Sequence, residues 1–218
     1  MMTKYVFIFL FITPIIFGQQ KPDWKLIVDQ DDLKVYRGTK QKNSIYPIRG
    51  DFYTNHTPAE IVAVLLDIPT KPKWLPKLTK TKLVKKFNST KWIEYAQIDV
   101  PWPCRNRDIV FELNMDINPD FSKVIFRLKS VDHSIVYNKS NIRAIVYDST
   151  MVITYDAKTE KSFIQSESFV DPKGYIPRWI VNLFQKRQTI NIAKALVEQL
   201  DKKLYADISE SKLRQGPN

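Results

Sequence analysis

Few side chains of this chain could do covalent or metal chemistry. It has one cysteine, Cys104, and two histidines, His56 and His133, among 218 residues. No GxSxG, HExxH, GxGxxG or P-loop pattern occurs, and no nucleophile and base stand at motif spacing. Two histidines make a poor metal cluster, and a lone cysteine is more often inert than an activated thiol. We therefore predict no catalytic residue, no metal and no cofactor.

One carboxylate lies in the apolar set of a predicted strand. In residues 92–100 the even positions are the more apolar ones and are expected to face inward, which would bury Glu94. Burial of a carboxylate is costly unless a charge pairs with it. Arg143, on another strand, is the predicted partner, and the two could then receive a polar group of a ligand. A solvated position for Glu94 at a sheet edge is the open alternative.

The basic charge is concentrated in one stretch. The net charge is +11, and no acid occurs between Asp67 and Glu94. Basic side chains beside Trp74, Leu75 and Leu78 suit an anionic membrane surface. The alternatives are a solvated lysine face or, without any recognisable motif for it, nucleic-acid binding; we predict no nucleic-acid partner. The lysines in question are Lys71, Lys73, Lys77, Lys80, Lys82, Lys85, Lys86 and Lys91.

The elements that must position these residues begin with strands and one short helix. Residues 33–38 and 44–54 are predicted to be strands. Residues 55–69 are predicted to contain a helix, because Thr57 and Glu60 have the spacing of a capping box and a proline follows Thr57 directly.

The rest of the chain predicts a meander and a long closing helix. Six segments rich in Val, Ile, Phe, Tyr and Thr follow one another at near-regular spacing, which indicates antiparallel strands. From Pro177 apolar residues recur at helical spacing over roughly 25 residues. So long a stripe needs the sheet as its partner, and the space between is either filled by side chains or left as a cavity. The six segments are 79–87, 91–100, 108–118, 123–131, 142–155 and 162–170.

Five stretches together resemble a START domain, the lipid-binding member of the helix-grip superfamily. They run from residue 24 to about 204 and occur in the family's order. Arg105 departs from the pattern, because members often have a small residue there. The resemblance implies an α+β helix-grip fold, with a strongly curved antiparallel sheet wrapped around a long C-terminal helix. The stretches are WKLIVDQDDLKVYR, VAVLLDIPTKPKWLPKL, PWPCRNRDIVF, IRAIVYDSTMVI and SFVDPKGYIPRWIVNLFQ.

The resemblance also places the site. The loop before Arg107 and Asp108 would lie at the mouth of a cavity, beside the start of the last helix. We expect these two residues to be a structural pair that fixes the mouth, through an ion pair at the start of the strand or through a bond to the loop backbone; direct ligand contact is the alternative. The mouth itself is predicted at Trp102, Pro103, Tyr175 and Ile176, with Trp102 as a gate or, alternatively, a core plug. The predicted ligand-binding residues are Glu94, Ala96, Ile98, Phe111, Leu113, Phe126, Leu128, Arg143, Trp179 and Leu183.

The expected function is to bind a lipid or sterol-like ligand in the cavity and to carry or transfer it without catalysis. The alternatives are a small-molecule enzyme in the same cavity and an interaction module that uses the lysine-rich face. Residues 1–18 read as a signal peptide, so the protein is expected to be exported, to the periplasm or outside the cell. Residues 19–205 would form the domain and 206–218 a disordered tail. A monomer with transient membrane contact is expected.

Overall fold

The computed structural model describes residues 23–30, 32–41, 45–135 and 139–217. The predicted signal peptide lies outside these residues. Ten strands form one sheet with the order β1-β2-β3-β10-β9-β7-β6-β5-β4, and β8 pairs with β6. The strands are β1 (Lys25–Gln30), β2 (Leu33–Arg37), β3 (Ile48–Thr54), β4 (Leu78–Lys86), β5 (Lys91–Ile98), β6 (Arg107–Ile117), β7 (Lys123–Ser130), β8 (Ile142–Arg143), β9 (Ile145–Asp156) and β10 (Lys161–Asp171).

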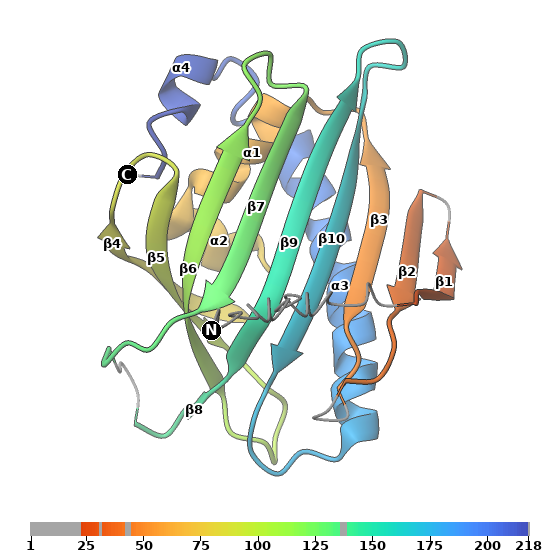
Figure 1. Cartoon of the computed structure of the whole chain (residues 1–218), viewed down its shortest axis with the longest axis vertical. Coiled ribbons are helices and arrows are strands. Elements are labelled where there is room, and N and C mark those ends of the chain that lie inside the picture. Colours follow the sequence, from red (N-terminus) through yellow and green to blue (C-terminus); the bar gives the residue numbers. More distant parts are fainter. Residues whose placement is uncertain (1–22, 31, 42–44, 136–138, 218) are drawn as a thin grey trace, which may run out of the picture.

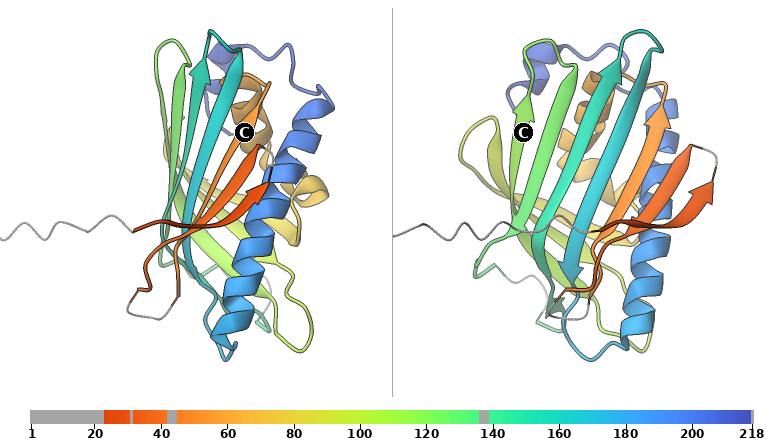
Figure 2. Two further views of the ribbon diagram at one scale, coloured as in Figure 1. Left: turned by 90° about the vertical axis from the view of Figure 1, so that its right-hand side faces the viewer. Right: turned by 45° about the vertical axis from the view of Figure 1, so that its right-hand side comes forward.

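The helices cover one face of this open sheet, and the longest runs along much of its length (Figures 1 and 2). All main strand pairs are antiparallel, and only β6 and β8 run parallel. The predicted α+β fold, a curved antiparallel sheet around a long helix, is confirmed. The helices are α1 (Pro58–Leu66), a 3₁₀ turn η1 (Ile68–Thr70), α2 (Lys71–Trp74), α3 (Arg178–Asp201) and α4 (Glu210–Leu213).

The predicted start of α1 is confirmed in detail. The Thr57 hydroxyl accepts a hydrogen bond from the Glu60 backbone N–H at 3.3 Å, and the Thr57 N–H donates to Glu60 Oε2 at 2.8 Å. This reciprocal pair satisfies two backbone donors that the first helical turn would otherwise leave unpaired. Pro58 occupies the first turn, where its missing N–H costs nothing.

The strand predictions differ from the structure mainly in two places. β1 was not predicted as a strand, because it pairs with β2 through an irregular register between Leu26 and Val28, which breaks the alternation. The segment 142–155 is divided between β8, which pairs with β6, and β9, which pairs with β7 and β10. Sequence periodicity does not reveal this change of partner.

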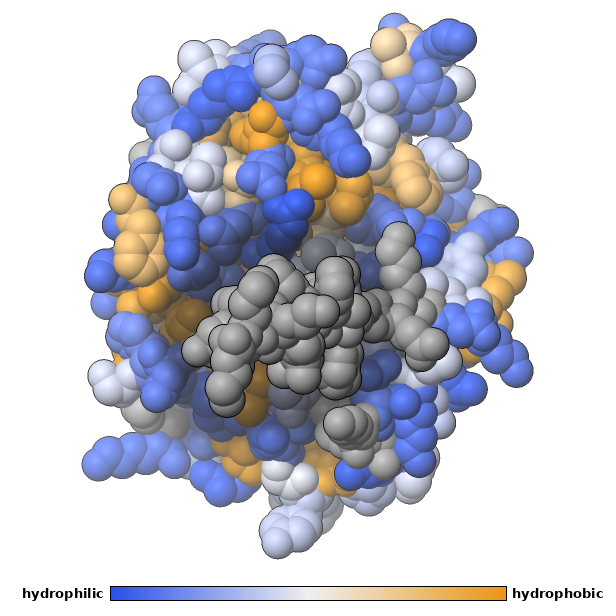
Figure 3. All heavy atoms as spheres, in the orientation of Figure 1, coloured by the Kyte–Doolittle hydropathy of each residue, from blue (hydrophilic) through white to orange (hydrophobic). Residues whose placement is uncertain are grey.

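The two faces of the sheet differ in character. The inner face packs its apolar side chains, among them Trp92, Met115 and Ile153, against α1 and the second half of α3. The outer face is largely hydrophilic, with smaller apolar patches (Figure 3). A second, small apolar cluster of Ile93, Tyr95 and Val110 lies there beneath residues 131–135.

Residues 206–217 differ from the predicted disordered tail. Leu213 of α4 is buried in the main core. The Arg214 guanidinium donates to the carbonyls of Asn118 and Pro119 at 3.0 and 2.8 Å, and Lys86 Nζ donates to the Pro217 carbonyl at 2.7 Å. The C-terminal segment therefore binds to the β4–β5 and β6–β7 turns at one end of the sheet. A polar segment with a single anchoring leucine has no periodicity from which sequence reasoning could find this.

Candidate functional site

One end of the molecule gathers the loop between β5 and β6, the turn between β10 and α3, and the beginning of α3 (Figures 1 and 2). We call it the mouth end, and the opposite end, where α4 lies, the closed end. Three large aromatic side chains project here: Trp102 is 92% exposed, Tyr175 fully exposed and Trp179 69% exposed. Pro103 is exposed and Ile176 half-buried. The structure thus brings the four predicted mouth residues together and leaves Trp102 in solvent rather than in the core.

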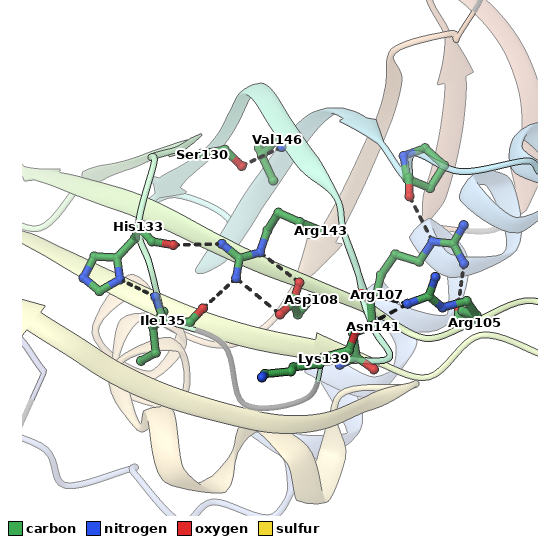
Figure 4. A network of polar contacts seen from close by, with 11 residues as sticks. Arg105, Arg107, Asp108, Ser130, His133, Ile135, Lys139, Asn141, Arg143 and Val146 are labelled. Atoms are coloured by element: carbon green, nitrogen blue, oxygen red, sulfur yellow. Dashed lines mark hydrogen bonds and ion pairs between the residues drawn. The ribbon is translucent and has the colours of Figure 1, made fainter.

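Arg107 joins the two loops of the mouth end. Its side chain is buried, and its Nε and Nη2 donate to the carbonyls of Pro172 and Lys173 at 2.9 and 2.8 Å, while Nη1 donates to the Arg105 carbonyl (Figure 4). Burial lowers the pKa of the guanidinium from its ordinary value, although an arginine stays protonated at neutral pH. The start of β6 is thereby tied to the turn that leads into α3.

Gly174 makes this close approach feasible. Its φ is +74°, in the left-handed region that side chains disfavour. A Cβ there would lie 2.9 Å from Ile142 Cδ1 and 3.2 Å from Arg107 Nη2. The preceding residues are held by Asp171, whose carboxylate accepts from the Lys173 backbone N–H at 2.9 Å and from Lys173 Nζ at 3.0 Å. Hydrogen bonds therefore hold the turn at Pro172 and Lys173, just before α3 begins.

Asp108 and Arg143 pair with each other on the outer face of the sheet. Arg143 Nε and Nη2 lie 2.8 and 3.3 Å from the two Asp108 oxygens, and the guanidinium also donates to the carbonyls of His133 and Ile135 (Figure 4). The predicted pairing of Arg143 with Glu94 is therefore wrong. Of the two forms expected for Arg107 and Asp108, the ion pair between them is not formed, whereas Arg107 does bond to the loop backbone. Adjacent residues of a strand point to opposite faces, so Arg107 and Asp108 secure different loops.

Glu94 lies on the inner face and has two partners that the sequence did not suggest. Its Oε2 accepts from Lys71 Nζ at 2.7 Å, and its Oε1 accepts from Trp92 Nε1 at 2.7 Å. Glu94 is 1% exposed and Lys71 8% exposed, so the solvated alternative for Glu94 is wrong. Lys71 is one of the lysines expected on the surface. Nothing in its local sequence indicates that η1 and α2 turn it inward.

The residues predicted to line the interior face inward on the strands but not on α3. The positions on β5, β6 and β7 face inward as alternation predicts: Ala96, Phe111, Leu113 and Phe126 are buried, whereas Ile98 and Leu128 are half-buried. On α3 the prediction is wrong, because Trp179 and Leu183 are exposed, at 69% and 41%. The helix instead turns the stripe of Val181, Ala193, Leu196 and Leu200 inward. Both stripes have helical spacing, so the sequence alone could not choose between them.

Burial varies along the inner face of β9 and β10. Ile153 and Ile164 are fully buried, whereas Met151 and Val170 of the same face are half-buried. Val146, which pairs with Val170, is buried. Part of the surface of Met151 and Val170 is therefore left uncovered on the side of the sheet that faces α3.

Two further properties bear on the site. Among the described residues, His, Cys, Asp and Glu side chains nowhere gather in a group of three that could hold a metal ion. None of the helices in the described residues is both long enough and apolar enough to cross a membrane.

The sequence matches the START domain family over residues 17–203. An uncharacterised protein of Pseudomonas aeruginosa is 31% identical over 183 residues, which cover 83% of this chain and 88% of that protein. The mouse phosphatidylcholine transfer protein is 27% identical and covers 82% of this chain and 86% of its own length. Among solved structures, a STAR-related lipid transfer protein fragment of Xanthomonas axonopodis superposes with a TM-score of 0.71 at 23% identity, covering 82% of this chain and 98% of the fragment.

Proposed function

The chain belongs to the START domain family, and from that premise we propose that it binds a lipid or sterol-like molecule between the sheet and α3 and transfers it between membranes without chemical change. One observation carries the proposal: Met151 and Val170 on the inner face are half-buried, while Ile153 and Ile164, nearer the closed end of the same strands, are fully buried. When a ligand covers apolar surface that the protein leaves exposed, the complex is stabilised by roughly 25 cal/mol per Å² of that surface.

The mouth end suits contact with a bilayer. Trp102, Tyr175 and Trp179 project together from one end of the fold, and amphipathic aromatic rings favour the interface between membrane and water. Basic side chains stand in the same loops, at Arg105 and Lys173, and would be drawn to anionic lipid headgroups. In our proposal these rings enter the interface while the ligand passes between the two loops.

The buried group of Lys71, Glu94 and Trp92 supplies a charged site within a largely apolar interior. An ion pair removed from water costs free energy and contributes little net stability, so its presence invites a functional explanation. We propose that this group meets the polar part of the ligand, as the sequence suggested for Glu94.

A transfer assay between liposomes tests the proposal. The purified chain is first examined by native mass spectrometry for a bound lipid-sized mass, and movement of a fluorescent lipid is then followed. We expect Trp102→Ala to slow transfer severalfold with an unchanged melting temperature. Phe87→Ala is the matched control, because Phe87 is an exposed aromatic residue in the β4–β5 turn at the closed end, where it contacts Lys85 and Lys91.

Absence of any bound lipid and of any transfer by the wild-type chain would refute the carrier function. Equal slowing by Trp102→Ala and Phe87→Ala would refute only the assignment of the mouth. We also propose that the protein acts after export, because residues 1–18 have the composition of a signal peptide. N-terminal sequencing of the secreted or periplasmic protein should then begin near Gln19, and an intact Met1 would contradict this.

A further inference from the structure

The first half of α3 presents amide side chains to the sheet beside the buried Val181. Gln185 Nε2 donates to the carbonyl of Val170 on β10 at 3.4 Å. One turn further on, Thr189 stands so close to β3 that a Cβ added at Gly50 would lie 2.7 Å from its Cγ2. Asn182 precedes Gln185 by three residues and therefore lies on the same helix face. This face is directed toward β10 and β3.

Two oxygens on this face have no hydrogen-bond partner within the described part of the chain. Asn182 Oδ1 and Gln185 Oε1 are both shielded from solvent and unpaired. The orientation of the Gln185 amide is determined by its neighbour, because the Val170 carbonyl can only accept and so must face the Nε2 group. Its Oε1 is consequently directed elsewhere. A buried acceptor without a donor is costly, so these two oxygens call for donors that the protein does not supply.

The opposite wall is polar and made of small residues. Ser166 pairs with Gly50 and Ser168 with Ile48, which places both serines on the inner face of β10 beside Val170. They are half-buried, and their small side chains leave room beneath the helix. A hydroxyl group can donate to one neighbour and accept from another. Amide oxygens above and serine hydroxyls below thus enclose a region that differs from the charged group at Lys71 and Glu94.

We propose that Asn182, Gln185, Ser166 and Ser168 form a second polar subsite, which binds a hydroxyl or amide N–H group of the ligand. This inference rests on the proposed carrier function and narrows its ligand class. A ligand that donates hydrogen bonds would satisfy the two acceptor oxygens, and a ligand without donors would leave them unpaired. Phosphatidylcholine has neither an O–H nor an N–H group, whereas a monoacylglycerol, a sterol or a sphingoid lipid has at least one. The chain therefore prefers a donor-bearing lipid to phosphatidylcholine.

Competition between defined lipids tests this preference. Delipidated full-length protein is offered mixed vesicles of phosphatidylcholine with a monoacylglycerol, and in parallel with the same glyceride after acetylation of its hydroxyls, and bound lipids are weighed by native mass spectrometry. We expect the wild type to enrich the hydroxylated lipid about tenfold over its acetylated form, because a site with buried acceptors rejects an analogue without donors.

Two variants of α3 test whether Gln185 causes the enrichment of the hydroxylated lipid. Gln185→Met keeps the length of the side chain and removes the unpaired oxygen, and should reduce the enrichment to about twofold while total lipid uptake persists. Gln188→Met is the control: it changes the same residue type on the same helix, but the Gln188 amide already donates to the Pro76 carbonyl at 2.7 Å, so the enrichment should stay near tenfold.

The outcomes separate the two proposals. Uptake of both lipids without enrichment, or an enrichment that Gln185→Met leaves unchanged, overturns the subsite and leaves the carrier function intact. Failure of the wild type to take up any lipid overturns the carrier function itself.

Discussion

The two ends of the space between the sheet and the helices differ in how they use apolar residues. At the closed end Trp92, Met115 and Ile153 are fully buried, and α1 and α4 cover them. At the mouth end Trp102 and Tyr175 project into solvent. Covered apolar surface stabilises the fold, whereas uncovered apolar surface is available to a partner. The comparison indicates that stability is concentrated at the closed end, and it agrees with the proposal that a ligand exchanges at the mouth end.

Helix α3 contains the same contrast within one element. Its second half buries Ala193, Leu196 and Leu200 in the core, whereas Val181 is the one buried side chain of the first half. Near its middle the helix lies close to β3, since a Cβ added at Gly50 would be 2.7 Å from Thr189 Cγ2. The second half thus anchors the helix, and the first half is held by the turn that Arg107 secures and by single hydrogen bonds from Gln185 and Gln188. Substitutions in the two halves should therefore have unequal effects.

The largest effect is expected at the closed end. Leu196→Ala should lower the free energy of unfolding by about 2–5 kcal/mol, because a fully buried leucine leaves a cavity when it is truncated. Leu183→Ala, on the exposed side of the first half, should cost less than about 1 kcal/mol. Urea unfolding followed by circular dichroism measures both, and equal losses would contradict the contrast between the halves.

A smaller effect is expected from Arg107→Met. The substitution deprives three carbonyl groups of their donor, which should lower the free energy of unfolding by about 1–3 kcal/mol. Hydrogen exchange should accelerate first in residues 172–177 and the first turn of α3. Arg105→Met is the control: its exposed guanidinium donates to the carbonyls of Lys139, Ser140 and Asn141 in another loop, so the substitution should cost about 1 kcal/mol or less and leave exchange in the turn before α3 unchanged. Unchanged exchange at 172–177 would show that Arg107 does not hold the turn.

The smallest effect concerns pH at the mouth end. Burial acts to raise the pKa of Asp171, but hydrogen bonds from the backbone and side chain of Lys173 outweigh it and leave the pKa below its ordinary value. The ionised Asp171 carboxylate therefore stabilises the folded state at pH values above its ordinary pKa near 3.8. This contribution is lost as the pH falls through the lowered pKa. Asp171→Asn should be less stable than the wild type at pH 6, by about 1 kcal/mol or less, and equally stable at pH 2. Urea midpoints at both pH values check this, and a constant difference would contradict it.

Local sequence patterns predicted most of the fold and part of the site. The capping box of Thr57 and Glu60, the alternation on β5 and β6, and the length of α3 each follow from neighbours in the chain, so propensity and periodicity reveal them. For the same reason Glu94 was correctly placed on the inner face. The mouth residues came from the family resemblance, and the structure brings them to one end.

The remaining features depend on residues far apart in the sequence. Lys71 meets Glu94, Arg143 meets Asp108, and Arg214 meets the β6–β7 turn only because the folded chain brings them together. Likewise, both stripes of α3 have helical spacing, and packing against the sheet decided which of them is buried. The sequence by itself determined the elements and the side of each strand that turns inward, because these follow from local hydrophobic periodicity. Only the tertiary structure decided which charges pair and which stripe of α3 turns inward, because those depend on where separate elements come to lie in space.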